Sequence, residues 1–242
     1  MKKTLLLAVM FGLVGCKGKF VWVSTAKETK PAEVTRPELN KDLSGVQFTF
    51  DDGPNLAYTP KILDILKQHK LQAIFFVEGI NLVGESEQAN ERRQLLKRAV
   101  EEGHIIGNHT YDHKDVCRIS EEKAAWEIDS TTKLIEGITG QKVTYFRSPY
   151  GKKCRILSKL LGNRNITQVG WEIDSREWQR DLKTHQFKTP AQVIDGIMLQ
   201  YKNLHDEQGI QKLVIILHDT KRVTAELLPD LLERLSKEQA TK

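Results

Sequence analysis

The stretch VQFTFDDGP, residues 46–54, decides the fold class of this chain. Its large apolar residues alternate with polar ones as in a β-strand, and Asp-Asp-Gly-Pro then marks a turn. A helix is predicted directly afterwards, because Thr59 can cap it and Pro60 suits its first position. A strand that ends in two carboxylates and leads into a helix is a typical unit of an α/β fold.

The same order of strand and helix continues along the chain. Further strands are predicted at 73–77, 104–107, 143–146, 167–171 and 213–217. The first of these is apolar throughout, as expected of a strand that is buried on both faces of a parallel sheet. One of the helices between the strands has a predicted cap at Ser120 and a predicted stop at Gly140. This alternation predicts parallel β/α units.

Five short motifs place polar or ionisable residues just past predicted strands. They are TFDDGP at 49–54, HTYDH at 109–113, RSPY at 147–150, Asp174 with Trp178 four residues on, and ILH at 216–218. In a parallel β/α barrel the catalytic groups lie on loops at the carboxyl ends of the strands. The five motifs are therefore expected to share one site.

The first two motifs together favour a metal ion. Asp51 and Asp52 would repel each other in one cavity unless a cation neutralised one of them. His109 and His113 are four residues apart, so on a helical turn they would share a face and present two imidazoles to one ion. With Asp52 they form a set typical of catalytic zinc. Taken singly, Asp-Asp-Gly-Pro is more often just a turn and a histidine pair is more often ordinary polarity.

In this order, the motifs resemble those of the polysaccharide deacetylase family, which is NodB-like and forms carbohydrate esterase family 4. The resemblance runs from Val46 to Leu235 and implies a distorted (β/α)7 barrel with a catalytic domain over residues 45–242. Relatives usually continue from the last helix into a further strand, whereas this chain ends at Lys242. We therefore expect the barrel to be open where that strand is missing.

The resemblance also implies how an acetamide is hydrolysed. Zn²⁺, or Co²⁺, Ni²⁺ or Mn²⁺ in its place, would be held by Asp52, His109 and His113 and would activate water and polarise the acetyl carbonyl. Asp51 would take the proton of the attacking water as the general base. Arg147 would hold and orient that base through a charge-assisted contact.

The remaining motifs supply the other roles. The backbone N–H of Tyr150 would stabilise the oxyanion, and His218 would protonate the leaving amine with Asp174 as its partner. Glu177 stands where the family often has Asp. A small pocket for the acetyl methyl group would be lined by Trp178, Ile216 and Pro149. For Trp178, plain packing in the core is the alternative reading.

The implied function is removal of acetyl groups from N-acetylglucosamine in a cell-envelope glycan, with peptidoglycan favoured. Chitooligosaccharide deacetylation and O-acetyl ester hydrolysis are alternatives within enzymes. A catalytically silent glycan-binding lipoprotein is the alternative outside them, although binding alone needs neither a base nor an acid. We expect a glycan polymer as partner, no nucleic acid, and a monomer.

The amino terminus reads as a bacterial lipoprotein signal. Lys2 and Lys3 precede an apolar run, and LVGC at 13–16 has the form of a lipobox, so we expect a signal peptide over 1–15 and lipidation of Cys16. A soluble secretory signal and an uncleaved anchor are alternatives, but the run is short for a membrane span. Residues 16–44 would form a flexible tether. The protein would then lie in the periplasm or on the outer membrane, bound to the bilayer only through Cys16.

Charge and cysteines add two limits. The formal charge of +5 falls to +3 when the two lysines of the signal are removed (37 − 2 bases against 32 acids), which does not indicate nucleic-acid binding. The two other cysteines, Cys117 and Cys154, could form a disulfide in an exported protein or remain free thiols. A length of 242 residues suits one large domain.

Overall fold

The structure, a computed structural model, describes residues 43, 45–180 and 185–240. Residues 239 and 240 are described by their backbone alone. The predicted signal peptide over 1–15, the lipidation site Cys16 and nearly all of the predicted tether over 16–44 lie outside the described residues. Within the described part of the chain, no helix combines the length and apolarity that crossing a bilayer would require.

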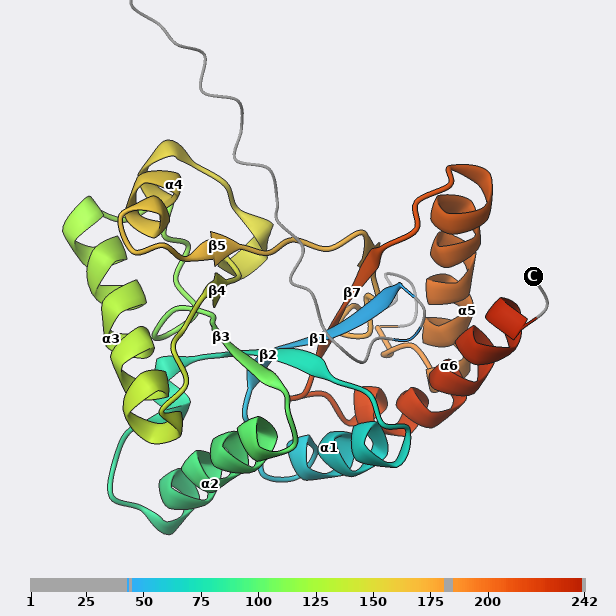
Figure 1. The fold of residues 1–242 in the computed structure, drawn as a ribbon, viewed down its shortest axis with the longest axis horizontal. Helices are drawn as coiled ribbons and strands as arrows, with labels where there is room; N and C mark the ends of the chain where they lie inside the picture. The colour runs from blue at the N-terminus through green and yellow to red at the C-terminus, as the bar shows by residue number, and fades with distance from the viewer. Residues whose placement is uncertain (1–42, 44, 181–184, 241–242) are drawn as a thin grey trace, which may run out of the picture. The chain divides into compact units, whose positions relative to one another are not determined.

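Seven parallel strands form one sheet in the order β5-β4-β3-β2-β1-β7-β6. The strands are β1 (Val46–Gly53), β2 (Ala73–Val77), β3 (Ile105–Asn108), β4 (Tyr145–Phe146), β5 (Thr167–Gln168), β6 (Ile173–Asp174) and β7 (Leu213–His218). The sheet curls into a half-barrel, and its edges are β5 and β6, which are consecutive in the chain (Figure 1). The predicted open α/β barrel is confirmed, with its opening between these two strands.

In the described part of the chain, six α-helices follow the outside of the curled sheet (Figure 1). They are α1 (Thr59–Gln68), α2 (Glu87–Glu101), α3 (Glu121–Thr139), α4 (Arg155–Gly162), α5 (Pro190–Tyr201) and α6 (Arg222–Ala240). Ser120 caps α3 by accepting from Lys123 N, and Gly140 ends it with a φ of 70°, as predicted. Thr59 does not cap α1: it is the first helical residue, and its hydroxyl donates to Asp219 Oδ2 at 2.6 Å.

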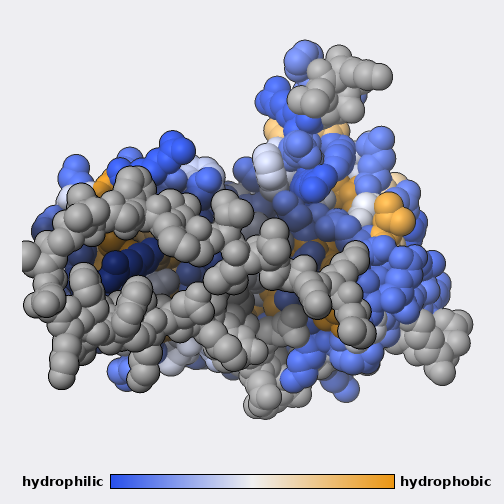
Figure 2. All heavy atoms as spheres, turned by 90° about the horizontal axis from the view of Figure 1, so that it is seen from above, coloured by the Kyte–Doolittle hydropathy of each residue, from blue (hydrophilic) through white to orange (hydrophobic). Residues whose placement is uncertain are grey.

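Strand β1 lies at the centre of the core. Phe48 and Phe50 are fully buried, and Phe50 stacks on Phe75 of β2 with ring centroids 5.0 Å apart. Burying one such side chain stabilises the fold by about 2 kcal/mol. The surface seen in Figure 2 is mostly hydrophilic, with smaller hydrophobic patches, as expected of residues facing water.

The strand predicted at 167–171 is shorter than expected, and β6 was not predicted. Beyond β5, the carbonyl oxygens of Val169 and Gly170 accept hydrogen bonds from the guanidinium of Arg147 at 3.4 and 2.8 Å. These carbonyls are thereby taken by a side chain rather than by a neighbouring strand. The chain then reaches β6 on the far edge of the sheet.

The predicted bridge between Cys117 and Cys154 is present, with a Cα–Cα distance of 5.9 Å. Cys117 lies in the loop that connects β3 to α3, and Cys154 directly precedes α4. The disulfide therefore joins the two loops that follow β3 and β4.

Candidate metal and catalytic site

Strand pairing brings the first and last motifs together. Asp51 of β1 lies opposite His218 of β7 in the parallel register, at the carboxyl ends of both strands. The second motif joins them because β3 pairs with β2 and His109 N donates to Val77 O at 3.0 Å. Residues separated by up to 167 positions in the chain thus meet at the carboxyl ends of the strands.

Three side chains form a candidate metal centre. One ligand atom each from Asp52, His109 and His113 can be chosen so that all lie within 4.8 Å of one another. Asp52 Oδ1 is 3.5 Å from His109 Nε2 and 3.6 Å from His113 Nε2. Two imidazoles and one carboxylate are a donor set that suits Zn²⁺ and neighbouring transition metals.

The polar atoms of this centre fit a cation. Asp52 Oδ1 is buried and has no hydrogen-bond partner among the described residues, although leaving such an atom unpaired is costly. Burial raises the pKa of Asp52, but the close contact with His109 Nε2 and the charges of the nearby histidines outweigh it and lower the pKa to about 2. A cation would pair this ionised oxygen.

Both histidines place Nε2 beside Asp52. Burial lowers the pKa of His109, but the charge of Asp51 and the contact with Asp52 raise it, so a metal ion would displace a proton from this ring. His109 Nδ1 lies 2.8 Å from Arg147 O, a backbone contact of the kind that fixes the ring of a metal ligand. Burial and the charge of His109 lower the pKa of His113, which favours the neutral, metal-binding form. The prediction that the two lie on one helical turn is wrong, because this segment is a loop in which His113 has a φ of 61°.

Left-handed backbone conformations gather around the centre. Asp52, His113 and Tyr150 have φ values of 73°, 61° and 58°, in a region that side chains other than glycine rarely adopt. Such strain concentrates at functional sites, where it aims side chains that regular structure would direct elsewhere. Gly53 follows for a steric reason: a Cβ there would lie 2.1 Å from Asp219 Oδ2.

Arg147 holds Asp51, as predicted. Its guanidinium donates to Asp51 Oδ1 at 2.8 Å and to Thr49 Oγ1 at 2.6 Å, and both charged side chains are almost completely buried. A buried pair of this kind needs further hydrogen bonds to offset desolvation, and the two carbonyls beyond β5 supply them. The role of Thr49 in this network was not foreseen, although it lies two residues before Asp51 on the same face of β1.

The partner of His218 is Glu177 rather than the predicted Asp174. His218 Nδ1 lies 2.9 Å from Glu177 Oε1, which also accepts from His218 N at 2.7 Å. Asp174 accepts instead from Arg176 N at 2.9 Å. The longer side chain of Glu177 comes from the loop after β6 and is buried, and Ser175 Oγ donates to its other oxygen.

This pairing sets the protonation of His218. Burial alone would lower the pKa of His218, but the hydrogen bond and charge of Glu177, together with the charges of Asp51 and Asp52, raise it to about 9. Burial alone would raise the pKa of the Glu177 carboxyl. The hydrogen bond and charge of His218 outweigh burial, so the pKa of Glu177 is lowered. Near neutral pH the pair is therefore an imidazolium held by a carboxylate.

A cavity of about 460 Å³ joins these groups. Asp174 lies in its wall, as do the predicted pocket residues Trp178 and Ile216. Trp178 is 46% exposed, so it is not packed in the core. Pro149 does not line the cavity: it is buried in the short helix η2 (Pro149–Gly151), and its neighbours Ser148 and Tyr150 face the cavity instead. Sequence reasoning missed three lining residues, Ser148, Trp171 and Lys221.

The arrangement suits hydrolysis of a carbonyl compound. A carboxylate fixed by arginine can accept a proton, and an imidazolium fixed by a carboxylate can give one. Asp51 and His218 both lie beside the candidate metal centre. The side chains of Trp178 and Ile216 add apolar surface to the same cavity. This combination provides a base, an acid and an electrophilic site in one cavity.

Comparison with protein families gives a match over residues 40–193 to the family described as polysaccharide deacetylase. Over 134 residues the chain is 37% identical to a peptidoglycan-N-acetylglucosamine deacetylase of Bacillus cereus, and the match covers 55% of this chain and 46% of that protein. The chain spans less than half the length of the first curated relatives that it matches.

Two solved structures are similar over most of this chain. Peptidoglycan deacetylase PdaC from Bacillus subtilis has a TM-score of 0.65 and 29% identity, covering 82% of this chain and 85% of that one. A pseudoenzyme of carbohydrate esterase family 4 from Bacillus anthracis has a TM-score of 0.69 and 26% identity, covering 87% of this chain and 66% of that one. The fold therefore accompanies both active and inactive sites.

Proposed function

Since this chain belongs to the polysaccharide deacetylase family, we propose that it is a zinc-dependent hydrolase acting on a cell-envelope glycan. It would remove acetyl groups from N-acetylglucosamine, with peptidoglycan as the preferred polymer. One observation carries the proposal: the candidate metal centre shares a cavity with Asp51, which Arg147 holds, and with His218, which Glu177 holds.

Hydrolysis of an acetamide adds water to the carbonyl carbon and breaks the C–N bond, which gives acetate and an amine. A cation held by Asp52, His109 and His113 would supply polarisation of the carbonyl and activation of water. Asp51 would accept the proton of the attacking water. Arg147 keeps the Asp51 carboxylate oriented toward the cavity, and its burial excludes competing water contacts.

The leaving amine needs a proton before the C–N bond breaks. His218, with its raised pKa, would donate this proton, and Glu177 would stabilise the imidazolium and fix the ring. The backbone N–H of Tyr150 would donate to the oxyanion, and Trp178 with Ile216 would surround the acetyl methyl group.

The pseudoenzyme among the similar structures makes loss of catalysis the main alternative. Here the base, its arginine, the acid and its carboxylate are all present and paired, which favours activity. An O-acetyl ester has a better leaving group than an amide and would use the same residues. Acetate release from N-acetylated and O-acetylated glycans would distinguish these substrates.

Asp51→Asn tests the proposed chemistry. The variant should keep its zinc, because Asp51 is not among the three proposed ligands, yet it should release acetate from peptidoglycan about a thousandfold more slowly. Zinc content by mass spectrometry and acetate release from purified glycan are the two measurements. Full activity of Asp51→Asn would refute the assignment of the base.

For localisation we propose an exported bacterial lipoprotein of the cell envelope, anchored through Cys16 after removal of residues 1–15. The sequence LVGC at 13–16 supports this, and a chain acting as a monomer on a polymer near its membrane would need a tether such as 16–44. Cys16→Ala should be released into the soluble fraction and lose palmitate labelling. A Cys16→Ala protein that stays on the membrane would contradict the anchor.

A further inference from the structure

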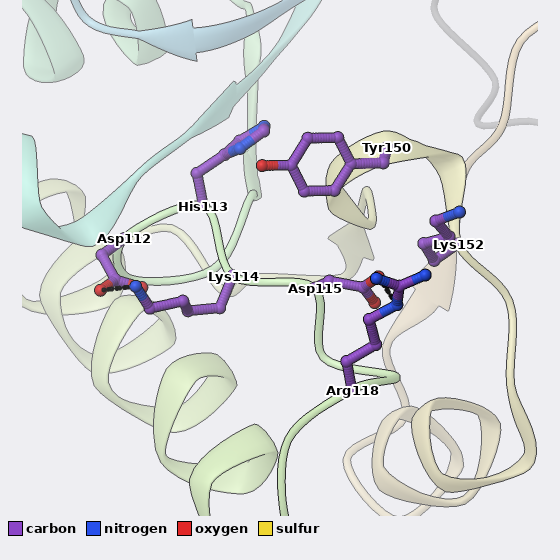
Figure 3. A pocket seen from close by; sticks show the side chains of 7 residues that line it. All are labelled: Asp112, His113, Lys114, Asp115, Arg118, Tyr150 and Lys152. Carbon is purple, nitrogen blue, oxygen red and sulfur yellow. Dashed lines mark ion pairs between the residues drawn. The ribbon is translucent and has the colours of Figure 1, made fainter.

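A second cavity, of about 610 Å³, adjoins the catalytic one. His113 and Tyr150 line both cavities, and their rings meet edge to face with centroids 4.7 Å apart. The two rings therefore form the wall between the cavities (Figure 3). A polymer that places one unit in the catalytic cavity would bring a neighbouring unit across this wall.

The lining of the second cavity is charged, with a surplus of cations. Lys114, Arg118 and Lys152 face Asp112 and Asp115, which leaves one positive charge in excess (3 − 2 = +1). Apart from His113 and Tyr150, every residue that lines this cavity has a charged side chain. Its chemistry therefore differs from that of the catalytic cavity, where Trp171, Trp178 and Ile216 provide apolar surface.

The two acids are already engaged. Asp112 pairs with Lys114 at 3.2 Å, and Asp115 pairs with Arg118 at 3.5 Å while it also accepts from Cys117 N at 3.0 Å (Figure 3). The side chain of Arg118 is 80% exposed in its pair, so solvent screens that contact and an incoming anion can compete for the guanidinium. The side chain of Lys152 has no ionic partner among the described residues.

The disulfide holds the cationic walls in place. Arg118 directly follows Cys117, and Lys152 lies two residues before Cys154. The bridge thus ties the loop after β3, which carries Arg118, to the loop after β4, which carries Lys152. The covalent bridge keeps Arg118 and Lys152 at the same cavity, where both can contact one anion.

We propose that the second cavity is a subsite for a carboxylate on the sugar unit next to the one being deacetylated, bound by Arg118 and Lys152. This inference rests on the proposed function, and it selects among substrates: peptidoglycan strands freed of their stem peptides fit, because their alternate units bear a free lactyl carboxylate, whereas chitooligosaccharides offer neutral neighbours. Guanidinium and ammonium groups bind carboxylates through charge-assisted hydrogen bonds. Neither side chain touches the groups assigned to the reaction.

The test compares kcat/KM for two tetrasaccharides with zinc-loaded protein. One alternates N-acetylglucosamine with N-acetylmuramic acid, and the other is chitotetraose. For Arg118→Gln with Lys152→Gln, the ratio of acidic to neutral kcat/KM should fall about tenfold, at roughly threefold for each exposed charge. Lys97→Gln, which removes one positive charge at an exposed lysine of α2 outside both cavities, should leave the ratio unchanged.

Amidation of the lactyl carboxylates should lower the wild-type ratio as much as the double substitution does, and 0.5 M salt should weaken the preference as well. Equal loss on both tetrasaccharides, or a ratio insensitive to amidation, would overturn the proposal. An effect confined to glycans that carry peptide stems would overturn the assignment to the sugar carboxylate.

Binding separates this inference from the proposed function. If no glycan releases acetate, equilibrium binding of the two tetrasaccharides to the zinc-loaded protein decides. Stronger binding of the acidic one, lost in the double variant and kept in Lys97→Gln, would support the subsite in a protein without catalysis. Equal binding of the two would refute it.

Discussion

The two sides of the half-barrel differ in how they fix the site. β1, β2 and β7 have 8, 5 and 6 residues and pair in register, so that Asp51 and His218 lie opposite each other. β4, β5 and β6 have 2 residues each; α4 with its flanking loops connects β4 to β5, and a short loop connects β5 to β6. On the long-strand side, position in the sequence determines position in the site. On the short-strand side, loop path and side-chain length determine it.

The largest expected effect tests the metal centre, which brings the end of β1 together with the loop after β3. His113→Ala should lose its zinc and reduce acetate release by about a thousandfold or more, because a metal contributes several kcal/mol to such reactions. Metal content and activity should fall together. His69→Ala, which changes an exposed histidine at the end of α1, should alter neither.

The contrast between Glu177 and Asp174 tests the short-strand side. Glu177→Gln should lower kcat by about a hundredfold, because His218 loses the charge that holds its proton. Asp174→Asn should stay within about threefold of the wild type, since its carboxylate accepts from a backbone N–H. The reverse order of the two effects would restore Asp174 as the partner. Glu177→Asp should fall between them, because the shorter side chain reaches less far.

The contrast between Glu177 and Asp174 shows which parts of the site can be predicted from the sequence and which cannot. The fold class was predicted from periodicity. The convergence of Asp52, His109 and His113 was expected from the residue types of their motifs, and the contact between Arg147 and Asp51 from the resemblance to the family. Asp174 and Glu177 are three residues apart in a loop, and no periodic signal distinguishes which carboxylate turns inward. Their burial, which decides the question, follows from tertiary packing.

The pH dependence gives a smaller effect with a defined sign. The pKa of His218 is raised from 6.5 to about 9, so the acid form is complete below the lower value and is lost as pH rises through the upper one. A profile of kcat should therefore decline on its alkaline side, at or somewhat below pH 9, because a bound cation nearby lowers the pKa. In Glu177→Gln this decline should move toward pH 6.5. An unchanged alkaline limb would show that Glu177 does not tune His218.

Removing the disulfide should affect catalysis least and should mainly lower the stability of the fold. The disulfide joins the loops after β3 and β4 and closes a span of 37 residues, which stabilises the fold by roughly 4 kcal/mol in the chain-entropy account. Cys117→Ser with Cys154→Ser should lower Tm by about 8–16 °C under oxidising conditions. The reduced wild type is the matched control and should melt with the variant. A Tm unaffected by both would show that the loops are held without the bridge.

Zinc titration of the metal-free protein tests the central claim most directly. Acetate release from purified peptidoglycan strands would be measured as zinc is added, with His113→Ala alongside. We expect no release without metal, activity that saturates at one zinc per chain, and no recovery in the variant. Full acetate release by metal-free protein, or equal recovery of His113→Ala at one equivalent, would contradict this claim.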